Sequence, residues 1–389
     1  MITLFRNFIR LFICISIILC GVKVSAQTAL VLHTIDKIES YKNISYQSVN
    51  KKKEIFASDT ITERHNAIFV KEPTDKNFGY SFNFQTLNEN GKVDHAELYN
   101  GQQLVYINPR DSSYSEQNSM AINAFNTLPV YLKWLHGRLE KKSTKVIKVN
   151  DTTINRVDCY HINVNVYDTI INKERNYSYA DLYIDKLSDL PRLTINRSRY
   201  TTYGNGVSTY YSASSYADYK FDQDDVDTVS FTKPKYYHPP AKVPVLTALT
   251  QGTAAPDWSL NDTEGKKMSL KQMKGKVILL DFFFIGCFPC MKSLPLLDSL
   301  HKKYRNQNFV IASISDRDSN KQVKAFKETY HINYPMYGNA AEVAKLYHID
   351  GAPTFYLIDQ QGKISSFREG YDDDLLRKMS AEIELLLKK

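Results

Sequence analysis

Apolar and polar residues alternate along much of residues 27–235, which is the pattern of strands with one buried face. Before these runs, Val31, Ile35 and Ile38 recur at the three-to-four spacing of a helix. We therefore predict an early helix followed by a long, mainly antiparallel β-sheet. The clearest strand runs are residues 80–84 (YSFNF), 104–107 (LVYI), 181–185 (DLYID) and 193–197 (LTINR), and the turn signals are Asn90-Gly91, Asn100-Gly101 and residues 204–206 (GNG).

The pattern changes in the last third of the chain. Residues 277–285 (VILLDFFFI) are apolar except for Asp281, as expected of a strand buried on both faces. Residues 287–290 (CFPC) follow, and residues 291–304 read as a helix that contains Pro295. Farther on, Ala352-Pro353 precedes a second strand-like run at residues 354–358, and an X-Pro bond placed there is a candidate cis peptide.

The Cys-x-x-Cys pair is placed for thiol–disulfide exchange. Two cysteines at this spacing can close a small disulfide ring. A cysteine at a helix N-terminus has its thiolate stabilised by the helix dipole and by free backbone N–H groups. We assign Cys287 as the attacking thiol, because it lies at the exposed end of the predicted helix, and Cys290 as the more buried, resolving thiol.

Length and composition predict two domains. At 389 residues the chain is long for a single domain of the typical size. Residues 234–244 contain four prolines, which makes them a stiff, extended connector. We predict a signal peptide at 1–26, a β-rich domain at 27–235, a proline-rich linker at 236–247 and an α/β domain at 248–389.

The first residues predict export. Arg6 and Arg10 precede an apolar core at residues 11–22, and small residues before Gln27 offer a cleavage site. The core is short for a membrane anchor of about 20 residues. A lipoprotein signal at Cys20 is the less favoured alternative, since Leu19 stands where a small residue is needed. We expect the mature protein in a periplasm or cell envelope, where nucleic acid is not a partner.

Export also reduces the cysteine count. Cys14 and Cys20 leave with the signal, so that Cys159, Cys287 and Cys290 remain. One Cys-x-x-Cys pair is too few for a zinc ribbon or for a disulfide scaffold, and we expect neither a metal nor a cofactor. Cys159 lies in an alternating strand pattern and is interpreted as a buried, inert thiol.

The C-terminal motifs together resemble the thioredoxin superfamily. The order of strand, Cys-x-x-Cys helix, proline within that helix, X-Pro and strand is matched element by element. Residues 252–260 (GTAAPDWSL) are similar to the opening of its exported TlpA/ResA-like branch of thiol–disulfide oxidoreductases. The resemblance covers residues 248–389 and implies a thioredoxin-like α/β fold, protein disulfides as substrates, a membrane electron donor and cytochrome c maturation as one setting.

The resemblance assigns further site residues. Asp281 stands at the position of thioredoxin's buried carboxylate, where it would titrate high and take the proton of Cys290. Pro353, if cis, would pack against the disulfide and leave the backbone of Ala352 free to pair with an extended substrate. Phe288-Pro289 is closer to the pairs of reductases than to those of strong oxidants, which favours a reductase.

The chain also departs from the family pattern. Gly286 replaces the usual tryptophan before the first cysteine, and Ser293 replaces a glutamate common in the ResA-like group, so that no proton relay through that glutamate is expected. A peroxidase would need proline and threonine at the positions of Leu280 and Phe284, which makes that reading weak.

The β-rich region has a weaker resemblance of its own. Residues 183–192 (YIDKLSDLPR) are similar to a strand and turn of the LolA/LolB-like half-barrels, and residues 216–221 with 231–234 are similar to the closing strand. That fold has an apolar cavity suited to acyl chains. The alternative function is therefore a carrier whose half-barrel holds a lipophilic or protein cargo. A β-domain that only positions the redox module is the other interpretation.

Overall fold

The computed structural model describes residues 25–53, 60–117, 127–171, 173–201, 207–226, 231–240 and 247–388. Nearly all of the predicted signal peptide lies outside these residues, as do the predicted turn at residues 204–206 and residues 241–246 of the predicted linker. The domain boundaries at 235 and 248 therefore stay predictions. In the described part of the chain, no helix is both long and apolar enough to span a membrane.

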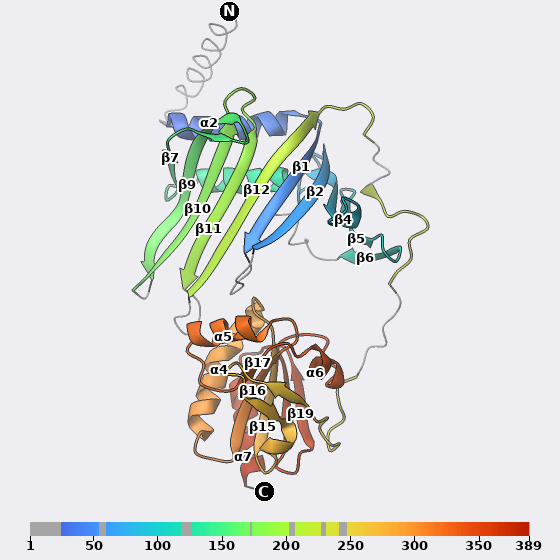
Figure 1. The fold of residues 1–389 in the computed structure, drawn as a ribbon, viewed down its shortest axis with the longest axis vertical. Coiled ribbons are helices and arrows are strands. Elements are labelled where there is room, and N and C mark those ends of the chain that lie inside the picture. Colours follow the sequence, from blue (N-terminus) through green and yellow to red (C-terminus); the bar gives the residue numbers. More distant parts are fainter. Residues whose placement is uncertain are drawn as a thin grey trace, which may run out of the picture.

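The predicted early helix is present as α2 (Ala26–Ser40). Ser25 caps it, because the Ser25 hydroxyl oxygen accepts a hydrogen bond from the Thr28 backbone N–H at 3.2 Å. The three apolar residues that predicted the helix, Val31, Ile35 and Ile38, are all buried. Their one-sided burial packs α2 against the N-terminal sheet (Figure 1).

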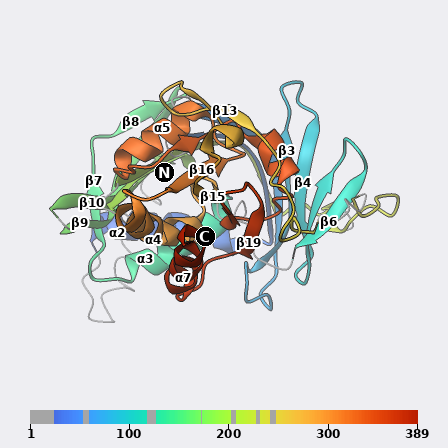
Figure 2. The same cartoon turned by 90° about the horizontal axis from the view of Figure 1, so that it is seen from below.

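The N-terminal sheet is antiparallel throughout, as predicted, but its strand order is not a single meander. The order is β6-β5-β4-β3-β2-β1-β12-β11-β10-β9-β7, with β8 paired to β9, so the first and last long strands are central neighbours. Figure 2 shows the sheet bent, with β9 and β10 on one side and β3 and β4 on the other. The described strands form an open sheet with edges at β6 and β7, not a closed barrel. The strands are β1 (Asn43–Lys53), β2 (Thr60–Lys71), β3 (Tyr80–Leu87), β4 (Val93–Tyr99), β5 (Leu104–Asn108), β6 (Ser113–Gln117), β7 (Lys145–Lys148), β8 (Thr152–Ile154), β9 (Val157–Ile171), β10 (Glu174–Asp185), β11 (Pro191–Thr201) and β12 (Val207–Phe221).

A second helix, α3 (Leu128–Leu139), was not predicted from the sequence. Pro129 reads as a break in a short apolar run, yet it stands in the first turn of the helix, where no N–H is required. Leu128, Leu132 and Leu135 are buried in the same hydrophobic cluster as the inner face of the sheet. Helices α2 and α3 therefore cover one face of the N-terminal sheet.

The C-terminal region forms a five-stranded sheet of order β17-β16-β15-β18-β19, which confirms the predicted thioredoxin-like α/β arrangement. β15 pairs in parallel with β16 and antiparallel with β18. Hydrophobic clusters lie on both faces of β15, one with α4 and α7 and the other with α6. The elements are the hairpin β13 (Ser259–Asn261) and β14 (Lys267–Ser269), the 3-10 turn η4 (Leu270–Met273), β15 (Val277–Phe283), α4 (Phe288–Tyr304), β16 (Phe309–Ser315), α5 (Asn320–Thr329), β17 (Met336–Tyr337), α6 (Ala341–Leu346), β18 (Thr354–Ile358), β19 (Ile364–Glu369) and α7 (Leu375–Leu387).

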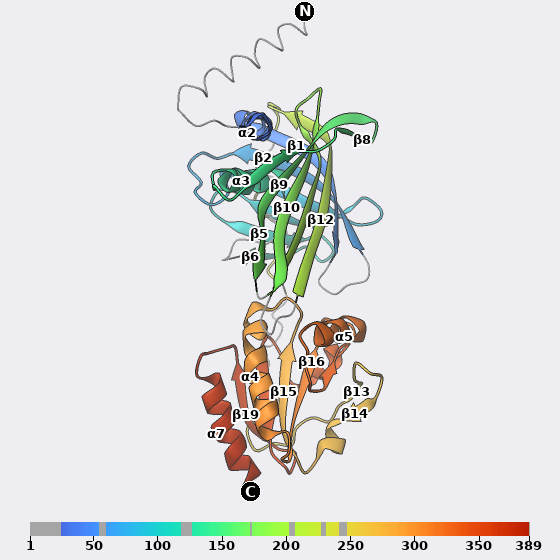
Figure 3. The same ribbon diagram turned by 90° about the vertical axis from the view of Figure 1, so that its left-hand side faces the viewer.

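The two sheets have separate cores. In the described residues, each large hydrophobic cluster belongs either to the N-terminal or to the C-terminal sheet. Figures 1 and 3 place the C-terminal sheet below the ends of β10, β11 and β12. There Ser208 of β12 and Tyr330, which follows α5, are hydrogen-bonded through their hydroxyl oxygens at 3.1 Å.

Candidate redox site

The two cysteines of the Cys-x-x-Cys motif form a disulfide with a Cα–Cα distance of 5.2 Å. β15 ends at Phe283, and a short loop leads to Cys287, which is the N-cap residue of α4. The helix begins at Phe288, three residues before the predicted start at residue 291. Pro289 suits this position, because the first turn of a helix needs no hydrogen bond from its N–H. The site thus lies between the end of the buried strand β15 and the N-terminus of α4 (Figure 3).

The prediction that Cys287 would be the more exposed cysteine is wrong for this oxidised form, since each of the two cysteines is 4% exposed. Their backbone environments distinguish them instead. The Cys290 N–H donates a hydrogen bond to Cys287 Sγ at 3.1 Å. This N–H and the helix dipole favour a thiolate on Cys287 once the disulfide is reduced.

Gly286 has a backbone conformation that explains the missing tryptophan. Its φ is +93°, in the left-handed region that residues with a Cβ rarely adopt. A Cβ built there would meet no atom within 4 Å, so the constraint comes from the backbone and not from crowding. The loop before Cys287 therefore requires glycine in this chain.

Asp281 lies on β15 and is 2% exposed. Val277, Leu279 and Phe283, at even spacings from Asp281, pack in the cluster that contains both cysteines. Because strand side chains alternate between faces, Asp281 points to the face of the sheet that α4 covers. The Ser313 hydroxyl donates to Asp281 Oδ2 at 2.6 Å, whereas Oδ1 has no hydrogen-bond partner in the described structure.

Burial raises the pKa of Asp281 to about 7, and the hydrogen bond from Ser313 opposes this shift. A carboxyl group with this pKa is partly ionised near neutral pH. Near neutral pH its carboxylate is therefore a stronger base than that of an exposed aspartate and can accept a proton from another group.

The predicted cis peptide is present between Ala352 and Pro353. The Ala352 carbonyl oxygen lies 3.6 Å from Cys287 Sγ, although these two residues are 65 positions apart in the chain. Both predicted substrate-binding residues are therefore brought to the disulfide, on the loop that leads into β18.

Asp318 is a site residue that sequence reasoning missed. Asp318 Oδ2 accepts hydrogen bonds from the Ile285 backbone N–H at 2.8 Å and from the Ser315 hydroxyl at 2.6 Å. Burial raises the pKa of Asp318. The Arg317 guanidinium lies 4.5 Å from the centre of the Phe284 ring. The strand β16 was not predicted from the sequence either. The available signal was its apolar pattern together with the polar residues 316–320 directly after it, since polar residues there meet other strand ends at the same edge of a sheet.

The surface beside the disulfide is formed by Phe288, which is 64% exposed. Lys292 Nζ lies 5.0 Å from the centre of the Phe288 ring and 5.8 Å from that of Tyr371. By contrast, Ser293 is buried and its hydroxyl donates to the Cys290 carbonyl oxygen at 2.7 Å. The Ser293 hydroxyl is therefore used by the backbone of the helix.

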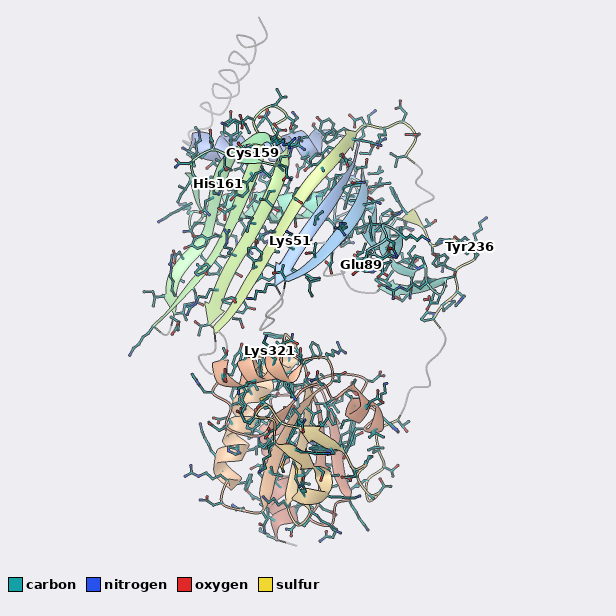
Figure 4. All side chains as sticks on the ribbon, viewed as in Figure 1. Lys51, Glu89, Cys159, His161, Tyr236 and Lys321 are labelled. Atoms are coloured by element: carbon teal, nitrogen blue, oxygen red, sulfur yellow. A yellow bond between two sulfur atoms is a disulfide. The ribbon has the colours of Figure 1, made fainter. Side chains whose placement is uncertain are left out.

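Cys159 plays no part in this site. Its side chain is fully buried, burial raises its pKa, and its thiol lies 3.4 Å from the Val157 carbonyl oxygen. Figure 4 places Cys159 at the α2 end of the N-terminal sheet, whereas Lys321 of α5 lies in the C-terminal region, beyond the opposite end of that sheet. In the part of the chain that the structure describes, no cluster of three or more His, Cys, Asp or Glu residues could hold a metal ion.

Comparisons with known proteins match the C-terminal region. Residues 251–367 match the family model described as the AhpC/TSA family. The thioredoxin-like protein YneN of Bacillus subtilis is 35% identical over 124 residues, which are 31% of this chain and 73% of the relative. The thiol-disulfide oxidoreductase ResA of Bacillus subtilis is 30% identical over 118 residues, or 30% of this chain and 66% of the relative. The solved thioredoxin domain of a thiol-disulfide oxidoreductase from Bacteroides vulgatus is 30% identical, with 35% of this chain and 99% of that one covered and a TM-score of 0.32.

Proposed function

Because the chain belongs to the thioredoxin-like family of thiol–disulfide oxidoreductases, we propose that it is an exported disulfide reductase of envelope proteins. The observation that carries the proposal is the placement of the Cys287–Cys290 pair at the N-terminus of α4, above a buried carboxyl group on the same face. The Phe288-Pro289 pair between the cysteines supports the direction of a reductase.

In the first step, the Cys287 thiolate attacks one sulfur of a substrate disulfide. A Cys287–substrate disulfide forms, and the other substrate sulfur leaves as a thiolate. The Cys290 N–H stabilises the attacking thiolate. The substrate segment lies along Ala352, whose carbonyl is already beside Cys287 Sγ, and its exposed side chains contact Phe288.

In the second step, Cys290 resolves the mixed disulfide. The Asp281 carboxylate takes the Cys290 proton, the Cys290 thiolate attacks Cys287 Sγ, and the second substrate thiolate leaves. The two released substrate thiolates acquire two protons, and the enzyme retains the disulfide seen in the structure. Recycling requires two electrons and two protons from a membrane dithiol donor, and cytochrome c maturation is one setting for such a cycle.

The reduction potential of the Cys287–Cys290 couple in the mature protein tests the proposed direction. A value near that of thioredoxin, about −270 mV, would support a reductase, whereas one near about −120 mV would make the protein a disulfide donor. Turnover of a model protein disulfide should be lost in Cys287→Ser. In Cys290→Ser a mixed disulfide should accumulate, because attack proceeds but resolution does not. Unchanged turnover in Cys287→Ser would refute the proposal.

A lipophilic carrier gains no support from the packing. In the described residues, the part of the inner face formed by β2, β3 and β4 is filled by its own side chains, including Phe69, Phe82 and Tyr99. To test this alternative, residues 27–240 are expressed alone and the purified protein is extracted with organic solvent. A bound lipid in the extract would restore it.

A further inference from the structure

A cavity of about 250 Å³ lies between α3 and the strands β10, β11 and β12 of the N-terminal sheet. It is separate from the redox site, and nothing in the proposed disulfide chemistry uses it. Its size is close to the lower end of the range of small-molecule sites. The cavity lies on the face of the sheet that α3 covers, and its walls differ in chemistry.

Aromatic rings form one part of the wall. Tyr131 and Trp134 come from α3, with their ring centres 5.7 Å apart and their planes 29° apart. Tyr210 and Tyr216 come from β12. Such rings offer flat apolar faces together with polar edges.

Side-chain hydroxyl groups form the floor. Ser178, Thr194, Ser198, Ser212 and Ser214 line the cavity from three neighbouring strands. They share one face of the sheet, because Ser178 pairs with Ser198, Thr194 pairs with Ser214, and the hydroxyl residues within each strand lie at even spacings. Each hydroxyl can both donate and accept a hydrogen bond. The floor is therefore suited to a ligand whose groups both donate and accept hydrogen bonds.

The described residues that line the cavity offer no unpaired charge to a ligand. Arg197 is among its lining residues, but the Arg197 guanidinium is bonded to the Asp181 carboxylate. Asn196 supplies an amide, whose Oδ1 accepts a hydrogen bond from the Tyr131 hydroxyl at 3.1 Å. Next to the floor, Asn50 donates to Ser214 Oγ at 3.1 Å and is 5% exposed, while its Oδ1 has no partner in the described structure. A buried carbonyl oxygen without a hydrogen-bond partner destabilises the folded protein, so this region favours a further hydrogen-bond donor.

We propose that this cavity binds a neutral sugar, either a monosaccharide or one end of an oligosaccharide. A sugar ring has an apolar face of C–H groups for Trp134 and the tyrosines, and its hydroxyls match the serine and threonine floor. An acyl chain offers no hydrogen-bonding group to these hydroxyls, of which Thr194 and Ser214 already have partners in Tyr216 and Asn50. An extended peptide has no strand edge to join there, because β10, β11 and β12 are each paired on both sides.

Tryptophan fluorescence of the full mature protein tests the proposal, since the chain has only two tryptophans. Trp134 lines the cavity, and Trp258 is buried in the C-terminal region. Maltose, cellobiose and diacetylchitobiose serve as probes, with dodecanoate and a serine- and threonine-rich peptide for comparison. We expect a saturable fluorescence change with at least one of the sugars, which persists in Trp258→Phe.

Matched variants localise the site. Asn196→Leu keeps the side-chain volume and should weaken sugar binding about tenfold, since it removes hydrogen bonds to the ligand. Ser198→Val is the second variant, in case Asn196→Leu fails to fold, and should also weaken binding. Thr209→Leu, an exposed residue on the other face of β12, is the control and should bind as the unmodified protein does.

Several results would overturn the proposal. These are the absence of saturable binding for all three sugars, saturation by dodecanoate or the peptide alone, and equal affinities in both cavity variants and the control. Cys287→Ser should bind the sugar normally, because the cavity does not depend on the redox chemistry. Failure of sugar binding is therefore distinguishable from failure of the disulfide reductase assignment.

Discussion

The Ile285 backbone N–H donates to Asp318 Oδ2 at 2.8 Å, and this bond ties the loop before Cys287 to the loop after β16. The second loop is held in turn, because the Asn339 N–H donates to the Asp318 carbonyl oxygen at 2.8 Å. Gly338 permits this close approach, since a Cβ there would lie 2.7 Å from the backbone of residues 318–320. The position of Cys287 thus depends on a carboxylate 31 residues farther along the chain.

Replacement of Asp318 should loosen this attachment. Asp318→Ala leaves the Ile285 N–H without its acceptor and should lower the free energy of unfolding by about 1–3 kcal/mol. It should also shift the reduction potential of the disulfide, because Cys287 loses its fixed position. Asp318→Asn keeps an acceptor oxygen and should restore most of both quantities. A potential unchanged in Asp318→Ala would show that Asp318 is only structural.

The pKa of Asp281 predicts a pH dependence of stability. The folded protein holds this proton up to a pH of about 7, whereas an exposed aspartate loses it near pH 4. Stability is therefore full below about pH 4 and decreases as the pH rises toward 7, because the unfolded chain then binds fewer protons than the folded one. Asp281→Asn should raise the free energy of unfolding at pH 8 by up to about 4 kcal/mol and change it little at pH 4. Denaturant unfolding at both pH values measures this, and an equal effect at both would contradict the assignment.

The same group should govern the resolving step. If the Asp281 carboxylate takes the proton of Cys290, the rate of resolution should rise with pH through about 7 in the unmodified protein. In Asp281→Asn this rise should disappear and the rate near pH 7 should fall about 10- to 100-fold. Single-turnover release of a substrate thiol, followed across pH 5–9, provides the measurement. An unchanged profile would assign the proton to another group.

Gly286→Ala should destabilise the protein through its backbone. The φ of +93° makes a side chain costly there, by about 1–2 kcal/mol. Gly137→Ala is the matched control, because Gly137 lies in α3 without a positive φ and a Cβ there meets no atom within 4 Å. It should be neutral or stabilise by about 0.5–1 kcal/mol. Thermal unfolding of the two variants separates the cases, and a Gly286→Ala protein as stable as Gly137→Ala would refute the argument.

Phe288→Ala should affect substrate binding more than stability. Its ring is largely exposed, so its loss exposes little new apolar surface and should change the free energy of unfolding by less than about 0.5 kcal/mol. A protein substrate that packs on this ring should show a severalfold higher KM with a similar kcat. A small disulfide reagent should react at the usual rate, and a matching loss with that reagent would point to a disturbed active site.

Regular periodicity accounts for the elements that sequence reasoning found. Three apolar residues at helical spacing were enough to predict α2, and the apolar run around Asp281 was enough to predict β15. These signals are local, since they depend on which side of one element is buried. Helix α3 was not predicted because Pro129 interrupts a short apolar run, although proline is well tolerated in the first turn of a helix.

Some features of the site could be recognised from residues that are close together in the sequence. These are the Cys-x-x-Cys spacing, the carboxylate in an apolar strand and the Ala352-Pro353 bond. Other features could not be recognised from the sequence. They are the proximity of Ala352 to Cys287, the attachment of Ile285 to Asp318, the equal burial of the two cysteines and the pairing of β1 with β12. These follow from contacts between residues far apart in the chain. Such contacts depend on how strands are ordered and how helices pack, and no short-range pattern of apolar residues encodes either of them.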